Sequence, residues 1–255
     1  MIVKQALYAF QILEFFADRK KPATLTEIAD HFGWPRSSTF NLIETLSKSG
    51  LLYELKFRTG YYPTRRLLDL GREIVTDGPL SDRLQTMVSN VADRTGETVA
   101  LAALSGLSAV FVEVVESRSL VRYAAKVGQR VPLHATSCGR AILSMIPPKE
   151  RATLLRKSDY KQFAPDSLMT PEAVEADVQL SIKRGWFLNN NGYAPDLLGL
   201  AIPLPLTDRQ LALMVAGPAF RTLGRLPELA EVLRSEIDRY TAEPGRNDFN
   251  LSTSI

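Results

Sequence analysis

The chain has 255 residues, of which 45% are hydrophobic, and a formal net charge of +3. This length and apolar fraction suit one large domain or two modest ones with true cores. No apolar run reaches the roughly 18–20 residues that a membrane-spanning helix needs, so we expect no membrane partner. One cysteine excludes an internal disulfide and favours a cytoplasmic location.

The positive charge is concentrated at one end of the chain. Residues 1–76 contain 11 Lys or Arg and 8 Asp or Glu, whereas residues 77–255 contain 20 of each. The entire excess of positive charge therefore lies in the first third. This asymmetry favours a nucleic-acid-binding end joined to a neutral remainder.

The first third has the order of elements that is typical of a helix-turn-helix. Thr24 and Glu27 form a capping box at the start of a second helix over 25–32, and Gly33 turns the chain into a third helix. A first helix over about 3–17 precedes them. Its apolar side, which we expect to be buried, carries Ala6, Leu7, Ala9, Phe10, Ile12, Leu13, Phe16 and Ala17.

The third helix begins with Pro35 and a polar first turn, and then places Leu42, Ile43 and Leu46 at core spacing. Arg, Ser and Thr at a helix N-terminus suit phosphate oxygens and base edges. An ordinary amphipathic helix is the alternative for this segment alone. We expect contacts in the DNA major groove from Arg36, Ser37, Ser38, Thr39 and Asn41.

A predicted two-stranded ribbon, over 51–55 and 61–63, follows the third helix. Lys56 and Arg58 lie at its tip, where a wing would touch the DNA backbone or the minor groove. A solvated hairpin is the alternative. We therefore predict a winged helix-turn-helix domain over 1–63 and a linker helix over 64–77, ending at the Gly78-Pro79 break.

The remaining chain, 78–243, alternates helical and strand patterns without a repeated unit, and the tail over 244–255 is expected to be flexible. Apolar runs over 98–104 and 109–115, and over 199–204 and 210–216, predict two hairpins. Hairpins with helices between them indicate an antiparallel α+β domain. The helices are predicted over 80–94, 137–145, 171–184 and 226–240.

Sequence patterns for catalysis are scarce in this second part. With two His and one Cys, a dedicated metal site is not expected, and no cofactor motif is present. His134 and Cys138 are the one pair with nucleophilic potential, because a helix N-terminus lowers a thiol pKa. The alternative is that both residues only pack or hydrogen-bond at a tight helix start.

Four segments resemble the signature segments of the isocitrate lyase regulator (IclR) family: residues 120–122, 131–141, 199–203 and 217–218. The most specific is Pro-Leu-His-Ala-Thr-Ser-Cys-Gly-Arg-Ala over 132–141, and the N-terminal part resembles the family's winged helix-turn-helix. The resemblance implies a transcriptional regulator that binds palindromic promoter DNA as a homodimer, often paired into a tetramer. It also implies a GAF-like C-terminal domain that binds a small organic acid.

Carried over by position, the resemblance implies a set of residues around the bound effector. The free N–H groups at the helix start near Ser137 suit a carboxylate. The implied effector-binding residues are Leu120, Ser137, Cys138, Asn189, Ile202, Met214 and Ala216.

The chain departs from the family pattern at several of these positions. Asn41 replaces a common Arg in the third helix, and Asn189 stands where an acidic run is usual. Met214 and Ala216 replace hydroxyl residues of members that bind small polar acids. The pocket should therefore be less negative and more apolar, which favours a larger anion such as an aromatic carboxylate, with Arg122 as its charge partner.

These observations predict a ligand-responsive transcription factor, repressor or activator, of a catabolic operon and not an enzyme. Two alternatives stay open. One is an enzyme that uses Cys138 as its nucleophile and carries a DNA-binding appendage. The other is an architectural protein that binds DNA without sequence preference and has a vestigial sensor domain.

Overall fold

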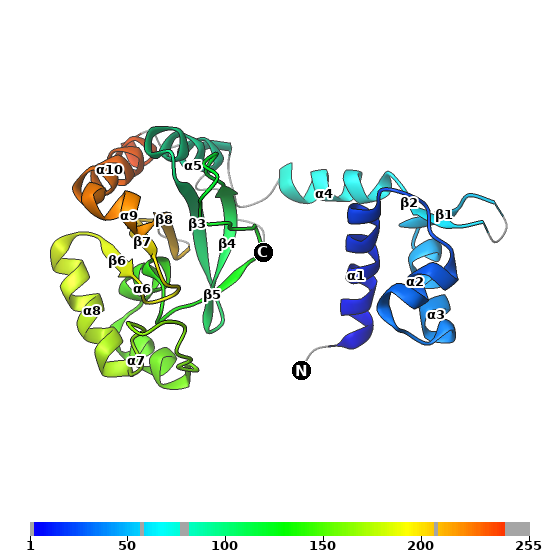
Figure 1. Ribbon diagram of the computed structural model, residues 1–255, viewed down its shortest axis with the longest axis horizontal. Helices are drawn as coiled ribbons and strands as arrows, with labels where there is room; N and C mark the ends of the chain where they lie inside the picture. The colour runs from blue at the N-terminus through cyan, green and yellow to red at the C-terminus, as the bar shows by residue number, and fades with distance from the viewer. Residues whose placement is uncertain (1–2, 57–58, 77–81, 207–208, 243–255) are drawn as a thin grey trace, which may run out of the picture. The chain divides into compact units, whose positions relative to one another are not determined.

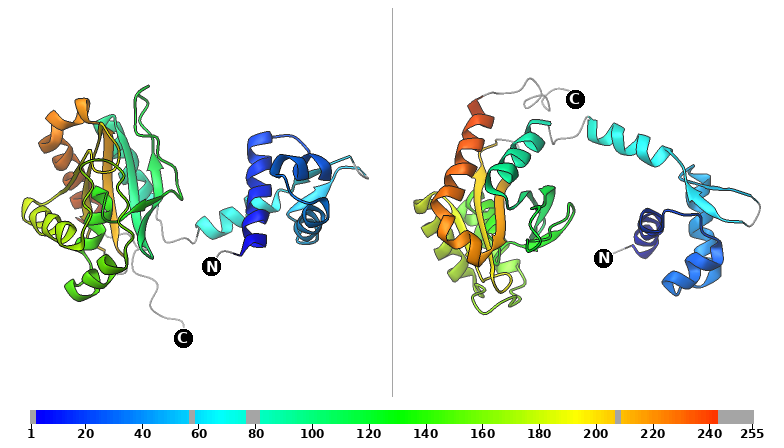
Figure 2. Two further views of the ribbon diagram at one scale, coloured as in Figure 1. Left: turned by 60° about the horizontal axis from the view of Figure 1, so that its bottom comes forward. Right: turned by 45° about the horizontal axis from the view of Figure 1, so that its top comes forward.

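The computed structural model describes residues 3–56, 59–76, 82–206 and 209–242. The chain forms two compact units, Met1–Pro79 and Leu80–Ile255 (Figures 1 and 2). Among the described helices, none is long and apolar enough to cross a membrane. In order, the described elements of the first unit are α1 (Lys4–Arg19), α2 (Leu25–Phe32), α3 (Arg36–Lys48), β1 (Leu52–Glu54), β2 (Tyr61–Pro63) and α4 (Arg66–Thr76).

Local signals in the sequence determine where these helices begin and end. The Thr24 hydroxyl accepts from the Glu27 N–H, and the Glu27 carboxylate accepts from the Thr24 N–H, so the predicted capping box is formed. Gly33 ends α2 with φ 67°, which is a left-handed conformation that favours glycine. Strands β1 and β2 pair antiparallel with Tyr53 opposite Tyr62, as the winged helix-turn-helix prediction requires.

The core of the first unit differs from the prediction on α1. Ile12 and Phe16 are buried as predicted, and Phe15, which the prediction left out, is buried as well. Leu7 and Phe10, predicted as core residues, are 44% and 67% exposed. Helical periodicity identifies an apolar face, but it does not say whether the same chain covers that face.

The second unit is an α+β domain with one antiparallel sheet. Its strands lie in the order β5-β4-β3-β8-β7-β6, and all adjacent strands are antiparallel. The described elements are α5 (Asp82–Thr95), β3 (Thr98–Ser105), β4 (Ser108–Val115), β5 (Arg130–Pro132), α6 (Ser137–Ser144), α7 (Pro148–Lys157), α8 (Pro171–Arg184), β6 (Phe187–Asn190), β7 (Leu197–Leu204), β8 (Leu211–Pro218), α9 (Ala219–Thr222), a 3₁₀ turn (Leu223–Arg225) and α10 (Leu226–Ala242).

Helices cover both faces of this sheet (Figure 1). Helices α5 and α10 pack on one face, where Val99, Leu200 and Leu213 belong to their core. Helix α6 packs on the other face over Ala100, Ala201 and Met214. Both predicted hairpins are present, but their pairing through β3 and β8, and the short edge strands β5 and β6, were not predicted.

Buried Arg140 fastens α6 to its surroundings. Its guanidinium donates to the backbone oxygens of His134 at 2.9 Å and Leu188 at 2.6 Å, and it forms an ion pair with Asp177 of α8 at 2.6 Å. Removing one partner of a buried ion pair leaves an uncompensated charge. Arg140 therefore ties the start of α6 to β6 and α8.

Gly139 has no room for a side chain, because a Cβ there would lie 2.5 Å from the Leu133 oxygen and 2.8 Å from Thr136 Oγ1. We expect Gly139→Ala to lower the free energy of unfolding by about 2–3 kcal/mol through overpacking. Urea denaturation measures this loss. Gly224→Ala is the matched control, because a Cβ at Gly224 meets nothing within 4 Å. Equal stability of the two variants would contradict the tight packing at α6.

Candidate nucleic-acid interface and ligand cavity

The exposed side of α3 carries most of the predicted DNA-binding residues. Arg36, Ser37, Ser38 and Asn41 are exposed, and the first turn of α3 contains no acidic residue. Pro35 precedes the helix without a side-chain cap, so the first N–H groups of α3 have no side-chain acceptor at that position. This helix end therefore offers both N–H donors and neutral or cationic side chains to an anion.

Thr39 does not lie on this surface, which corrects the prediction. Its side chain is fully buried, and Thr39 Oγ1 donates to the Pro35 oxygen at 3.1 Å. The residue sits one helical turn before Ile43, on the core side of α3, so it cannot reach DNA. Lys56 is exposed beyond β1, and Arg58 lies outside the described residues.

Phe40 is a surface residue that the sequence analysis left out of the DNA contacts. Its side chain is 46% exposed, next to exposed Asn41. An apolar side chain on a recognition helix can contact the methyl group of thymine. The sequence could have identified Phe40 as a surface residue, because it falls outside the core spacing of Leu42, Ile43 and Leu46.

A cavity lies in the second unit between α6 and the sheet. The space between the surrounding atoms measures about 290 Å³, part of it open to solvent. Five predicted effector residues line it together: Ser137, Cys138, Asn189, Met214 and Ala216. The structure also adds residues that the sequence analysis missed, namely Phe111, Tyr123, Val131, Thr136, Tyr193, Leu197 and Gly199.

Small residues on neighbouring strands create the floor of the cavity. Asn189, Gly199 and Ala216 lie opposite one another on β6, β7 and β8. A Cβ at Gly199 would lie 2.9 Å from Ser137 Oγ, so a side chain there would displace the Ser137 hydroxyl. The Gly139 N–H is capped by Thr136 Oγ1 at 3.2 Å. The N–H groups of Ser137 and Cys138, two residues that line the cavity, lack intrahelical acceptors.

Three predicted effector residues lie outside the cavity, and two of them belong to the segment over 116–123. Leu120 is 97% exposed, and Arg122 forms an ion pair with Glu116 at 3.0 Å on the surface. Tyr123 of the same segment faces the cavity instead. The segment has no strand or helix periodicity that could have shown which side chains point inward.

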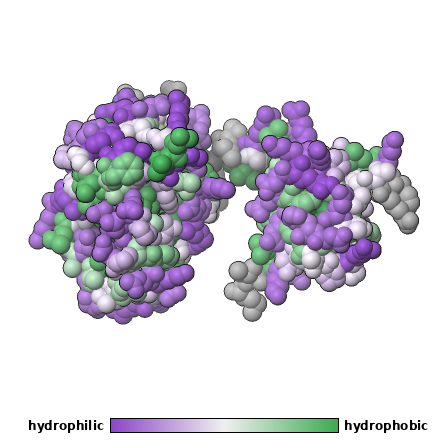
Figure 3. All heavy atoms as spheres, in the orientation of Figure 1, coloured by the Kyte–Doolittle hydropathy of each residue, from purple (hydrophilic) through white to green (hydrophobic). Residues whose placement is uncertain are grey.

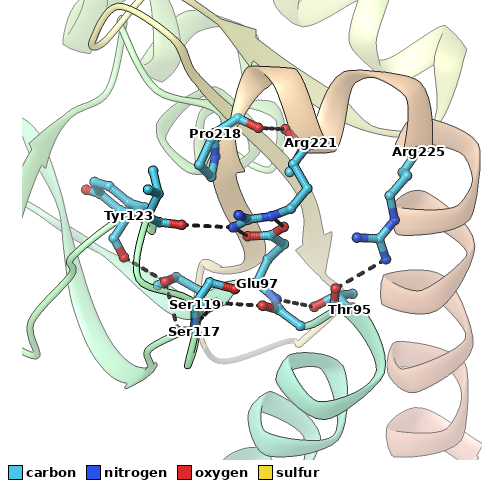
Figure 4. A network of polar contacts seen from close by, with 12 residues as sticks. Thr95, Glu97, Ser117, Ser119, Tyr123, Pro218, Arg221 and Arg225 are labelled. Carbon is cyan, nitrogen blue, oxygen red and sulfur yellow. Dashed lines mark hydrogen bonds and ion pairs between the residues drawn. The ribbon is translucent and has the colours of Figure 1, made fainter.

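A buried ion pair fixes this segment in place (Figure 4). Glu97, which is 1% exposed, accepts from Arg221 Nε at 2.5 Å and from Arg221 Nη2 at 2.7 Å. Arg221 also donates to the Val121 oxygen at 3.1 Å, and Thr98 Oγ1 donates to the Tyr123 oxygen at 2.6 Å. These bonds connect the 116–123 segment to the start of β3 and to α9.

Ile202 is the third predicted effector residue that lies outside the cavity. It packs on the opposite face of the sheet, in the core shared with α5 and α10. Met214 pairs with Ala201, and Ala216 pairs with Gly199, so the cavity side of β7 is that of residues 199 and 201. Because side chains alternate between the two faces of a strand, Ile202 points away from the cavity.

Asn189 connects the cavity to the loop that follows β6. Oriented to satisfy both of its polar groups, the amide donates to the Ala135 oxygen at 3.0 Å and accepts from the Tyr193 N–H at 3.3 Å. Gly192 lies close beside it, because a Cβ there would come within 2.5 Å of the Asn189 side-chain amide. Asn189 thus joins the segment before α6 to the loop that carries Tyr193.

The thiol of Cys138 is not activated. Burial raises the pKa of Cys138 to about 11, against smaller opposing effects from Thr136 and the helix N–H groups. This agrees with the alternative in which Cys138 only packs at the helix start, and it gives no support to the nucleophile. His134 points elsewhere: its Nε2 lies 3.2 Å from the Lys161 oxygen, and burial lowers its pKa.

The cavity can bind an anion through neutral donors. None of its described lining residues is charged. The donors are the α6 N-terminus, the Ser137 hydroxyl and the tyrosine hydroxyls, and burial keeps the pKa of the Tyr123 phenol far above neutral pH. Phe111, Met214 and Leu197 give the remaining wall an apolar character that suits an organic ligand.

A helix-turn-helix unit joined to an α+β unit with an internal ligand cavity defines a ligand-responsive DNA-binding regulator. The chain belongs to the IclR family. The profile described as "IclR helix-turn-helix domain" matches residues 8–56, and that described as "Bacterial transcriptional regulator IclR C-terminal" matches residues 73–238. The protein is therefore a DNA-binding transcriptional regulator, of a family whose members bind small-molecule effectors and typically oligomerise.

Individual relatives agree with this assignment. The chain is 25% identical to the acetate operon repressor of Salmonella typhimurium, over 91% of this chain and 86% of that protein. The structure of Thermotoga maritima IclR matches 94% of this chain and 98% of that chain, with 22% identity and a TM-score of 0.77.

A second solved structure is of an IclR homolog from Microbacterium hydrocarbonoxydans complexed with 4-hydroxybenzoate. It matches 92% of this chain and 99% of that chain, with 21% identity and a TM-score of 0.68. At these identities the two structures show a shared fold.

Because its pKa is raised, Cys138 should stay protonated at neutral pH. We expect iodoacetamide to alkylate it at least about 100-fold more slowly than a free thiol, with a rate that rises toward pH 11. Mass spectrometry measures the rate, and urea-unfolded protein is the control. Rapid stoichiometric alkylation at pH 7 would instead support a nucleophilic role for Cys138.

Proposed function

We propose that the chain controls transcription from a palindromic operator in response to an aromatic carboxylate, bound in the cavity beside α6. The observation that carries this proposal is the cavity itself. It combines a helix N-terminus with apolar walls and contains no charged side chain among its described lining residues. Ligand binding would shift the relative populations of conformations that differ in operator affinity.

The chemistry of the lining favours an aromatic acid over a small polar one. A carboxylate can accept from the N–H groups at the start of α6 and from Ser137, while a ring packs against Phe111, Met214 and Ala216. Small polar acids would leave the apolar wall without contacts. The 4-hydroxybenzoate complex of the Microbacterium homolog supports this ligand class.

The DNA contacts that we propose divide into two groups. Arg36, Ser37, Ser38 and Asn41 of α3 would enter the major groove, where side chains on a recognition helix contact bases and phosphates. Lys56 and Arg58 of the wing would bind the backbone without reading sequence. We assign residues 1–63 to DNA binding and residues 64–77 to the linker.

Exposed apolar side chains in the first unit supply a candidate surface for pairing two copies. Val3, Leu7 and Phe10 are exposed on α1, and Leu68 and Ile74 are exposed on α4. Apolar areas interrupt the hydrophilic surface of this unit (Figure 3). Burying such patches between two copies is favourable, and a symmetric dimer matches the symmetry of a palindromic operator.

The alternative of an enzyme has less support from the geometry. Cys138 is fully buried with a raised pKa, and His134 bonds to Lys161 rather than to the thiol. The alternative of an architectural DNA binder does not explain a cavity built from glycine and alanine at closely packed strand positions. We therefore propose regulation through binding, without turnover of the ligand.

Replacing Arg36 by Ala should weaken operator binding by about 1–3 kcal/mol if Arg36 contacts a base. Ligand binding should stay intact.

Replacing Lys56 by Ala should instead weaken binding to all DNA sequences alike and reduce the slope of the salt dependence by about 1. Fluorescence anisotropy with operator and random duplexes at several salt concentrations separates these effects. Unchanged operator affinity of the Arg36→Ala variant would remove that residue from the interface.

A thermal-shift screen tests the ligand class. We expect benzoate or 4-hydroxybenzoate at 100 times its Kd to stabilise the protein by about 2.7 kcal/mol. Ala216→Leu, which fills the cavity floor, should abolish this shift, and Leu180→Ala on exposed α8 is the surface control. Stabilisation by glyoxylate or pyruvate alone would contradict the aromatic assignment.

A further inference from the structure

A second pocket lies on the surface of the second unit, beside the edge formed by β4 and β5. Arg130, His134, Lys157, Phe163 and Tyr193 are among its lining residues, and the space measures about 770 Å³, part of it open to solvent. We call this the outer pocket. None of the sequence motifs or effector residues described above accounts for it, apart from His134.

Tyr193 is common to the described linings of the outer pocket and of the cavity beside α6. It is half-buried, and its ring centroid lies 5.4 Å from that of Phe163. Phe163 in turn lies 6.0 Å from the His134 ring. Tyr193 therefore lies where the two spaces adjoin, and its ring contacts Phe163, which with His134 lines the outer pocket.

Hydrogen bonds from Asn189 and from Ser167 hold the loop that carries Tyr193. Asn189, which lines the cavity, accepts from the Tyr193 N–H. Ser167 donates to the Gly192 oxygen at 2.7 Å, and the same hydroxyl accepts from the N–H groups of Phe163 and Ala164 at 3.0 Å. A group that binds Asn189 from inside the cavity would compete with the bond that positions Tyr193.

Charge and ring chemistry in the outer pocket suit the same ligand class as the cavity. Arg130 and Lys157 give it two cations against the single carboxylate of Asp159. The Lys161 ammonium lies 5.6 Å from the centre of the Phe163 ring. Cations beside exposed aromatic rings attract an anion that also has a flat apolar face.

We propose that the outer pocket is the docking site through which aromatic carboxylates reach the cavity, and that Tyr193 is the gate between the two. Tyr193 then determines which ligands enter, because a ligand must displace its ring and stack in the space that it leaves. This inference rests on the proposed function for the ligand class. The access route itself can be tested without any effector.

Cys138 provides the probe, because it is the chain's single cysteine and lines the cavity. The aromatic carboxylate disulfide 5,5′-dithiobis(2-nitrobenzoate) reacts with a thiolate to form a mixed disulfide. One thionitrobenzoate anion leaves and is counted by its absorbance. Neutral 2,2′-dithiodipyridine reacts in the same way, so the ratio of the two rates isolates the effect of ligand charge.

Closed gates open with populations of about 0.1–10%, so Tyr193→Ala should raise the modification rate at least about tenfold with both reagents. Tyr123→Ala, which removes another half-buried ring from the cavity lining, should change the rate by less than about twofold if this gate controls access.

Lys157→Glu tests the charge of the outer pocket, and it should slow the anionic reagent relative to the neutral one by about threefold. Lys149→Glu, the same change at the other end of α7, should leave the ratio unchanged.

The rates are measured in several urea concentrations below the unfolding transition. Access through a local gate depends weakly on urea, whereas access through global unfolding follows the whole unfolding equilibrium. An unchanged rate in Tyr193→Ala, a larger effect of Tyr123→Ala, or a steep urea dependence would overturn the gate. If Tyr193→Ala opens the cavity but aromatic carboxylates fail in the thermal-shift screen, the gate stands and only the proposed ligand class is wrong.

Discussion

The close approach of the first turn of α6 to the sheet is the constraint on which the ligand-binding unit depends. Gly199 leaves no space for a Cβ beneath Ser137, and Gly139 leaves none beside Leu133. Arg140 then fastens the same helix to β6 and α8 from the other side. This packing holds the start of α6, where Ser137 and Cys138 line the cavity, over a floor of small residues, and this is the site that we propose for the carboxylate.

Two further contacts relate this site to the parts of the unit that can respond to a ligand. The Glu97–Arg221 pair holds the 116–123 segment, from which Tyr123 faces the cavity. Asn189 holds the loop of Tyr193 from within the cavity. A ligand that bonds to Asn189 or stacks on Tyr123 therefore acts on segments that a few named hydrogen bonds hold in place. Such differential contacts are what a population shift between two states requires.

Local sequence signals predicted most of the fold. The capping box at Thr24, the glycine after α2 and the two apolar hairpins gave the elements and their order, because caps and alternation act over a few residues. The pairing of β3 with β8 was not predictable in this way, because it joins strands far apart in the chain. The exposure of Leu7 and Phe10 depends on tertiary packing, which periodicity does not contain. The burial of Thr39 does follow from periodicity, because Thr39 lies one helical turn before Ile43.

The site was predicted where residues lie at the fixed start of a helix or on a strand, and missed elsewhere. Ser137, Cys138, Asn189, Met214 and Ala216 line the cavity. On β7, the alternation of side chains between the two faces puts Gly199 and not Ile202 on the cavity side.

The central claim is that ligand binding in the cavity changes the affinity for the operator. It is tested most directly by a gel shift on DNA upstream of the protein's own gene, with random competitor, with and without saturating 4-hydroxybenzoate. The account predicts that the protein selectively retards the operator fragment, and that its affinity for the operator changes by about 5–150-fold when ligand is added. Two results would contradict it: random competitor that removes the operator complex as readily as a complex with random DNA, or an operator affinity that ligand does not change.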